Sequence, residues 1–403
     1  MTENRNLPRL AFFRQGQAIT LPPTRLAFQS GVPLTNGSTI QEHLDARTLV
    51  GNLGNMIHRM AMIQMVKCDR SRSSQLNLFK LIATHKSVQK VADLINANFD
   101  GLMMTMSNIL RPDAQEPDIA ELVRALKVPV YCLGIGLQGE LPHGKADVLT
   151  ADVRDLMYAL DERAALFGVR GEQTLNWLRS IGIKNAKALG CPSMFAYPRN
   201  ILSIKRPQKL DRIITAGHLK LTPDESSRGH KLMRGFTNTS PAYVFQGEIA
   251  HFKELLHQQG VYDEATQTLH RATISDLINR KCKIKSPFGE YYSFGESSAW
   301  RQACTKYDLY VGDRIHGGVA AMQVGVAALV LHADTRVQEL ANYHGIPSCP
   351  LEDFERLGVK RAVEEYLTES AMDAFKNRYA AVLDNFESEC TRAGLALSNR
   401  LSA

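Results

Sequence analysis

Residues 307–336 decide the fold of this chain and read YDLYVGDRIHGGVAAMQVGVAALVLHADTR. The short apolar run at residues 309–311 predicts a buried parallel strand, because none of its side chains is charged. Small residues between positions 317 and 323 predict a helix, and the apolar run at residues 326–331 predicts a second buried strand. A strand, a helix and a second strand in this order are typical of an α/β fold.

The turn between the first strand and the helix carries three polar side chains, Asp313, Arg314 and His316. A strand that leads into a helix directs backbone N–H groups and the positive end of the helix dipole at one point, which suits an anion. Arg314 adds a planar guanidinium that matches phosphate or carboxylate, and His316 can transfer a proton near neutral pH. The alternative is structural: both side chains cap the helix or pair with Asp313.

The Arg314-Ile315-His316-Gly317 turn, with its following helix and strand, resembles the signature of the polysaccharide pyruvyl transferase family. Members of that family transfer the pyruvyl group of phosphoenolpyruvate onto a sugar as a ketal. Their Arg-x-His is followed by an apolar strand and an Asp-x-Lys element. Here that element has Arg336 in place of Lys. The charge is kept, but Arg binds as a fork and not as a point charge.

The same resemblance extends to the first half of the chain. The family carries Asn-x-Gly-Asp at its first strand–helix turn, where it lines the cleft. Asn52 and Gly54 match this element, and Asn55 stands where Asp is usual. A carboxylate base is therefore absent at this place, although an amide can still orient a hydroxyl. The alternative is a tight turn that uses Gly54 for its backbone freedom.

A predicted strand at residues 129–133 ends in the pair Gly134 and Gly136. Paired glycines at the carboxyl end of a strand allow a ligand to approach the backbone closely. The resemblance implies that this pair forms part of the cleft wall. Two further polar positions depart from the family pattern. Asn108 ends a strand where a glycine run is common, and Cys191 stands where Asp is usual.

Arg170 follows the predicted strand at residues 164–169. The resemblance implies that an Arg at this place binds the donor. The alternative is a surface ion pair with Glu172 or Asp161.

In the second half, a predicted strand at residues 212–216 leads to Gly217 and His218. We expect His218 either to face a ligand on the acceptor side or to be structural. The polar residues 219–235 predict an irregular loop, and residues 198–207 predict a linker because they contain two prolines. Tyr291, Tyr292, Phe294 and Trp300 either stack on sugar rings or pack in the core.

A chain of 403 residues is longer than a single hydrophobic core usually supports, so two domains of about 200 residues are expected. We predict an α/β protein with two Rossmann-like doubly wound domains. The resemblance implies that they face each other across a cleft, as in GT-B glycosyltransferases. The predicted parts are an arm at residues 1–45, an acceptor-side domain at 46–200, a donor-side domain at 208–365 and closing helices at 366–403.

Composition narrows the class of protein. Lys and Arg number 48 against 41 Asp and Glu, so the net charge of +7 favours anionic partners. We find no basic block, zinc-finger spacing or RNP-like motif, so no nucleic-acid partner is predicted. The seven scattered cysteines predict reduced thiols, with no disulfide framework and no metal site. No signal sequence and no apolar run of about 18 residues is present, which predicts a cytoplasmic protein.

The resemblance implies a pyruvyltransferase that uses phosphoenolpyruvate as substrate and needs no cofactor. The catalytic candidates are Arg314 and His316. The donor-binding candidates are Gly134, Gly136, Arg170, Arg314, His316, Gly317 and Arg336, and the acceptor-side candidates are Asn52, Gly54, Asn55 and His218. The implied acceptor is a polysaccharide or a lipid-linked oligosaccharide, with peripheral contact at the inner face of the cytoplasmic membrane. The oligomeric state stays open.

Two other functions fit the same pattern. A glycosyltransferase with a nucleotide-sugar donor shares the architecture and also needs cationic contacts to phosphate. A non-catalytic glycan- or phosphate-binding relative would tolerate the departures at Asn55, Asn108, Cys191 and Arg336.

Overall fold

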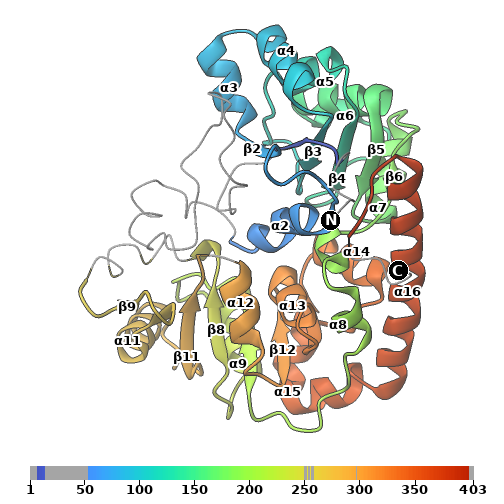
Figure 1. The fold of residues 1–403 in the computed structure, drawn as a ribbon. Helices are drawn as coiled ribbons and strands as arrows, with labels where there is room; N and C mark the ends of the chain where they lie inside the picture. The colour runs from blue at the N-terminus through green and yellow to red at the C-terminus, as the bar shows by residue number, and fades with distance from the viewer. Residues whose placement is uncertain are drawn as a thin grey trace. The chain divides into compact units, whose positions relative to one another are not determined.

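The computed structural model describes residues 7–13, 53–248, 252, 255, 258–295 and 297–398. These residues form two compact units, which Figure 1 shows with their helices and strands. The first unit contains residues 7–13, 58–196 and 381–398, and the second contains residues 53–57 and 197–380 apart from the gaps just given. Each unit is built on its own sheet.

The sheet of the first unit has the strand order β2-β1-β3-β4-β5-β6, and its described neighbours are all parallel. The strands are β1 Leu10–Phe13, β2 Ser74–Leu76, β3 Gly101–Thr105, β4 Val130–Ile135, β5 Ala164–Val169 and β6 Lys187–Ala188. Every residue of β1, β3 and β4 is buried, as expected for parallel strands that are covered on both faces.

Helices alternate with these strands. They are α2 Asn55–Met65, α3 Leu78–His85, α4 Val88–Asn98, α5 Ile119–Ala125, α6 Ala151–Arg163 and α7 Glu172–Ser180, with 3-10 turns η1 Ala146–Val148 and η2 Pro192–Phe195. Capping residues set several of their beginnings. Ser87, for example, accepts a hydrogen bond from the Lys90 backbone N–H and begins α4.

The second sheet has the order β14-β13-β12-β7-β8-β11-β10-β9. Its strands are β7 Ile213–Thr215, β8 Ala242–Phe245, β9 Tyr262–Asp263, β10 Thr268–Leu269, β11 Glu290–Ser293, β12 Leu309–Gly312, β13 Ala327–His332 and β14 Ser348–Pro350. Among the described strands, β10 pairs antiparallel with both β9 and β11, and the other neighbours are parallel. The parallel strands run outward from β7 through β8 to β11 on one side, and from β12 through β13 to β14 on the other, which is the doubly wound Rossmann order.

The second unit contains α8 Pro198–Leu202, α9 Arg228–Gly235, α11 Arg271–Cys282, α12 Ser297–Cys304, α13 Ile315–Met322, α14 Thr335–His344 and α15 Leu351–Tyr366. The long α16 Glu369–Arg392 begins in the second unit and ends in the first. Among the described residues, no helix is long and apolar enough to cross a membrane.

The predicted fold class, two Rossmann-like α/β domains, is confirmed by these two sheets. The strand–helix–strand unit at residues 307–336 is found as β12, α13 and β13. All seven cysteines are free and buried. The aromatic residues near β11 belong to the core, because Tyr291, Phe294 and Trp300 are each at most 3% exposed.

One local prediction is wrong in part. Residues 219–235 are not wholly irregular, because α9 begins at Arg228 behind the capping side chain of Ser227. The predicted linker at residues 198–207 contains α8, since Pro198 occupies the first turn, where a missing N–H has no consequence.

Candidate functional site

The predicted turn with Asp313 and Arg314 lies at the switch point of the second sheet. It follows β12, and His218 follows the neighbouring strand β7. These two strands are where the order of the parallel strands reverses. Ligands of doubly wound sheets bind outside the carboxyl ends of the strands at such a point. This edge of the sheet is therefore the candidate site.

Close packing around Tyr310 fixes the backbone of this turn. The Tyr310 hydroxyl donates a hydrogen bond of 2.6 Å to the carbonyl oxygen of Arg314. A Cβ atom on Gly317 would lie 2.7 Å from the Tyr310 ring, so only glycine fits at this position. The Gly317 backbone N–H donates to the Arg314 carbonyl oxygen at 2.9 Å. Gly317 thus lets α13 approach the sheet, and its N–H is engaged within the turn.

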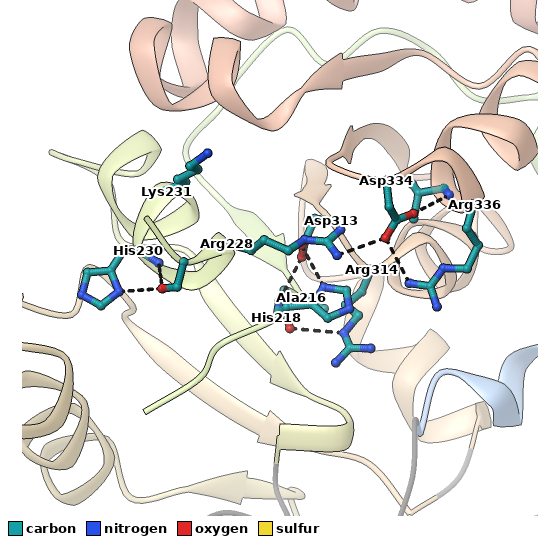
Figure 2. Close-up of polar contacts among 12 residues, drawn as sticks. Ala216, His218, Arg228, His230, Lys231, Asp313, Arg314, Asp334 and Arg336 are labelled. Carbon is teal, nitrogen blue, oxygen red and sulfur yellow. Dashed lines mark hydrogen bonds and ion pairs between the residues drawn. The ribbon is translucent and has the colours of Figure 1, made fainter. Parts of the chain in front are cut away.

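Asp313 is the buried centre of the site, and Figure 2 shows the side chains around it. Its Oδ1 accepts from the His218 backbone N–H at 3.1 Å, and its Oδ2 lies 2.8 Å from His218 Nδ1. The Nε of Arg228 is 3.0 Å from the same Oδ2. Burial alone would raise the pKa of Asp313, but the His218 hydrogen bond and the nearby charges lower it below its ordinary value. Asp313 is therefore ionised.

Arg314 pairs with Glu248, which follows β8, and not with Asp313. Its Nη2 donates to Glu248 Oε1 at 2.6 Å, and its Nε lies 3.2 Å from the same oxygen. Glu248 is held in turn, since its Oε2 accepts from the Gln246 backbone N–H at 2.8 Å. Burial lowers the pKa of the Arg314 guanidinium, but Glu248, Asp313 and Tyr243 together raise it above its ordinary value. The predicted anion-binding fork is thus oriented along one edge by a carboxylate.

Asp334 adds a third carboxylate to the site. It caps α14 by accepting from the Val337 backbone N–H at 2.9 Å. Arg228 Nη1 donates to its Oδ2 at 3.0 Å, and Arg336 Nη2 lies 3.5 Å from the same atom. Burial would raise the pKa of Asp334, but the charges of Arg336 and Arg228 and the Val337 bond lower it. Arg228, on α9, therefore bridges the turns after β12 and β13 (Figure 2).

The charges of this network alternate. Three guanidinium groups meet three carboxylates in the set Arg228, Arg314, Arg336, Glu248, Asp313 and Asp334. An arginine carries five N–H donors, so these pairs do not use all of them. Among the described residues, no group accepts from Arg228 Nη2, although that atom is buried. The site can thus still donate hydrogen bonds to an anion.

His316 was predicted in the turn before the helix, but α13 begins at Ile315, so His316 lies in its first turn and is 5% exposed. His218, Arg314, His316, Gly317 and Arg336 all belong to the second unit. Of these candidates, His218 and Arg314 lie close to each other. Asp313 accepts from the His218 backbone N–H, and Arg314 Nε lies 3.3 Å from the carbonyl oxygen of Gly217, the residue before His218.

The candidates Gly134, Gly136 and Arg170 come together in the first unit, at the carboxyl ends of β4 and β5. Arg170 is buried and donates from Nε to the Gly134 carbonyl oxygen at 2.9 Å and from Nη1 to Asn108 Oδ1. A Cβ atom on Gly136 would lie 2.8 Å from Arg170 Cδ, which explains the glycine. The surface ion pair with Glu172 or Asp161 does not form, because Arg170 is only 4% exposed.

A buried trio next to this cluster was not predicted. The Cys191 sulfur lies 3.8 Å from His58 Nδ1 and 3.0 Å from Ser193 Oγ. Gly134 has φ +88°, and a Cβ atom there would lie 2.9 Å from His58 Cε1. Where the resemblance leads us to expect a carboxylate, the chain has a thiol packed beside an imidazole.

The remaining candidates lie at the beginning of α2. Gly54 is in the turn before the helix, where its carbonyl oxygen accepts from the Ile57 backbone N–H at 3.2 Å. Asn55 is the first residue of α2 and is half-buried. Asn52 lies outside the described residues. Across the described part of the chain, no group of three His, Cys, Asp or Glu side chains is arranged to hold a metal ion.

Arg228, Glu248 and Asp334 were not identified as site residues from the sequence. A local signal existed for the first, because Ser227 precedes His230 by three residues and accepts from its backbone N–H. That cap would have placed Arg228 in the first turn of a helix. Glu248 has no comparable local signal, since it lies 66 residues from its partner.

Several solved structures are similar in outline at low sequence identity. HepE of Anabaena in complex with UDP and glucose is 14% identical and has a TM-score of 0.41, with 76% of this chain and 79% of that chain covered. UDP-GlcNAc 2-epimerase from Methanocaldococcus jannaschii is 13% identical with a TM-score of 0.40, covering 74% and 80%. An E. coli trehalose-6-phosphate structure bound with UDP-2-fluoro glucose is 10% identical with a TM-score of 0.44, covering 97% and 100%.

No curated protein is similar enough to this chain to count as a match. The family model described as Polysaccharide pyruvyl transferase, in contrast, matches residues 52–332. This segment includes residues of both units and contains Asp313, Arg314 and His316. It ends before Asp334 and Arg336. The chain therefore belongs to the polysaccharide pyruvyl transferase family.

Proposed function

We propose that this protein transfers the pyruvyl group of phosphoenolpyruvate to two hydroxyls of a sugar, forming a ketal and releasing phosphate. The observation that supports this most strongly is the position of the Arg314–His316 turn. It lies within the family match and at the switch point of the second sheet, where doubly wound folds bind ligands.

The donor carries a phosphate and a carboxylate and needs fixed N–H donors. Glu248 contacts the Nε and Nη2 edge of Arg314, and the guanidinium fork can use its remaining N–H groups for an anion. Arg228 and Arg336 supply further donors around Asp334. In the first unit, Arg170 is held by Gly134 and Asn108, and we propose it as an additional donor-binding residue.

The chemistry requires protonation of the methylene carbon of phosphoenolpyruvate, which makes the central carbon electrophilic. Two sugar hydroxyls then bond to that carbon, and its bond to the phosphate oxygen breaks. We propose His316 as the residue that protonates the methylene carbon, because an imidazole exchanges protons readily near neutral pH. A His316→Ala variant should lose turnover and keep its fold, and near-normal turnover would remove His316 from this role.

The proposed acceptor is a polysaccharide or a lipid-linked oligosaccharide. The net charge of +7 is compatible with an anionic glycan or with an anionic membrane surface, at which we propose peripheral contact. We propose phosphoenolpyruvate as a substrate, with no cofactor.

Release of phosphate from phosphoenolpyruvate tests this function, with and without a panel of β-galactosides, mannosides and lipid-linked oligosaccharides. We expect acceptor-dependent release and a product whose mass has increased by one pyruvate less one water. Binding of a uridine diphosphate sugar, without binding or turnover of phosphoenolpyruvate, would favour a glycosyltransferase. Binding of a glycan together with no release from any acceptor would favour a non-catalytic relative.

A further inference from the structure

We propose that His218 is a second catalytic residue, which takes the proton from the attacking sugar hydroxyl, and that Asp313 positions its imidazole. This inference rests on the proposed pyruvyl transfer. It assigns a base to the first hydroxyl, at the stage of the reaction where His316 acts as the acid.

The geometry fixes which ring nitrogen of His218 carries the proton. Asp313 Oδ2 lies 2.8 Å from His218 Nδ1, and a carboxylate can only accept a hydrogen bond. Nδ1 therefore holds the proton when the ring is neutral, and Nε2 has the free lone pair. The second carboxylate oxygen accepts from the His218 backbone N–H at 3.1 Å, so one carboxylate fixes both the main chain and the ring of His218 (Figure 2).

Burial differs between the two ends of this pair. The Asp313 side chain is 0% exposed, whereas the His218 side chain is 20% exposed. Among the described residues, none forms a hydrogen bond with His218 Nε2. Among the described residues, the buried Asp313 carboxylate thus engages Nδ1, and Nε2 stays available to a substrate. His230 shows the opposite arrangement, since Ser227 Oγ at 2.9 Å and the Cys282 carbonyl oxygen at 2.8 Å engage both of its ring nitrogens.

The surroundings keep Asp313 an acceptor. Arg228 on α9 is 3.0 Å from its Oδ2, and Arg314 in the same turn adds a second positive charge. Gly217 permits the close approach, because a Cβ atom there would lie 3.0 Å from Asp313 Oδ1 and 2.3 Å from a methyl carbon of Leu232. With its pKa lowered, Asp313 stays ionised and stabilises a protonated His218 ring.

Two histidines balance the protons of the reaction. His316 gives a proton to the methylene carbon as the first hydroxyl oxygen bonds to the central carbon, and His218 Nε2 takes the proton of that hydroxyl. The carbon–oxygen bond to phosphate then breaks, and phosphate leaves with the electron pair and the proton held by His218. The second hydroxyl bonds to the carbon and returns a proton to His316. Two C–O bonds form, one breaks, and both histidines regain their starting states.

The test compares His218→Gln and Asp313→Asn with His270→Gln. Gln keeps a side chain that can donate to Asp313 but cannot take a proton, and Asn removes the negative charge behind the ring. His270 is an exposed histidine of the same unit, whose ring contacts Thr273. We expect both site variants to lose about 10²- to 10⁴-fold in kcat, with binding of phosphoenolpyruvate by calorimetry changed less than about threefold in His218→Gln. The His270 variant should match wild type.

The pH profile separates a base from a structural residue. In wild type, kcat/KM for the acceptor should fall at acid pH, because a general base must be unprotonated to act, and this limb should vanish in His218→Gln. NMR of wild-type protein with nitrogen-15-labelled histidine gives a second measurement, which does not depend on whether a variant folds. It should show neutral His218 with its proton on Nδ1, and a proton on Nε2 would overturn the proposal.

The outcomes separate this inference from the proposed function. If wild type turns over and His218→Gln retains its kcat and its acid limb, the base role is overturned and pyruvyl transfer stands. If wild type releases no phosphate with any acceptor, the proposed function fails and the base role fails with it.

Discussion

At the scale of single residues, the partner of Arg314 changes how its turn is understood. The sequence favoured either a free anion-binding fork or a pair with Asp313, and the structure has Arg314 paired with Glu248 instead. The Arg314 side chain is 13% exposed and that of Glu248 is 5% exposed, so the pair is shielded from solvent. A shielded carboxylate orients a guanidinium firmly, which suits recognition of a second, incoming anion.

Removal of Glu248 should therefore destabilise the protein and weaken donor binding. We expect Glu248→Ala to lower the free energy of unfolding by about 3 kcal/mol, because it leaves a buried guanidinium without its counter-charge. The control is Glu352→Ala, which breaks the pair with Lys231 at a carboxylate that is 61% exposed and should cost less than about 1 kcal/mol. Urea denaturation measures both, and equal losses would contradict the role given to Glu248.

A second prediction at this scale concerns the substitution of Gly317. A methyl group there meets the Tyr310 ring at 2.7 Å, whereas at Gly318 the nearest ring atom is 3.2 Å away. We expect Gly317→Ala to lower stability by about 1–3 kcal/mol and Gly318→Ala to lower it less. Thermal unfolding of the two variants decides this. A larger loss for Gly318→Ala would mean that the ring does not limit the approach of α13.

At the scale of elements, α9 matters because it carries Arg228 between two carboxylates. Its beginning depends on Ser227, whose side chain accepts from the His230 backbone N–H. Ser87 caps α4 in the first unit in the same way. The two caps are matched in chemistry, and only one of them begins a helix of the candidate site.

We expect Ser227→Ala and Ser87→Ala each to lower the free energy of unfolding by about 1 kcal/mol, because each removes one helix cap. Only Ser227→Ala should also lower turnover, by several-fold, since Arg228 would lose its fixed place beside Asp313 and Asp334. Denaturation and phosphate-release assays of both variants test this. Equal turnover in the two variants would show that α9 does not position the site.

The elements also show what the sequence can reveal. Apolar runs and a glycine-rich turn predict β12, α13 and β13 because strand and helix preferences are local. The helix α9 was not predicted because its sequence is mainly polar, although the side chains of Leu232 and Met233 are buried. The pairs of the site are not local at all: Arg228 and Asp334 are 106 residues apart, and only the order of the strands brings them together.

At the scale of the whole molecule, each unit has its own parallel sheet and its own group of candidate residues. The second unit holds the alternating charges around Asp313, and the first holds Arg170 with its glycine pair. The family match includes residues of both units. The family was identifiable from the sequence because its signature is a short local motif, whereas the ion pairs that orient the motif depend on the completed fold.

The central claim is that the bond between the central carbon and the phosphate oxygen of phosphoenolpyruvate breaks as a sugar ketal forms. The most direct test uses donor labelled with heavy oxygen at that bridging position, followed by mass spectrometry of the phosphate and the glycan. Pyruvyl transfer predicts the label in the released phosphate, and a glycan heavier by one pyruvate less one water. Label retained in free pyruvate, with a glycan of unchanged mass, would show phosphate hydrolysis and contradict the account.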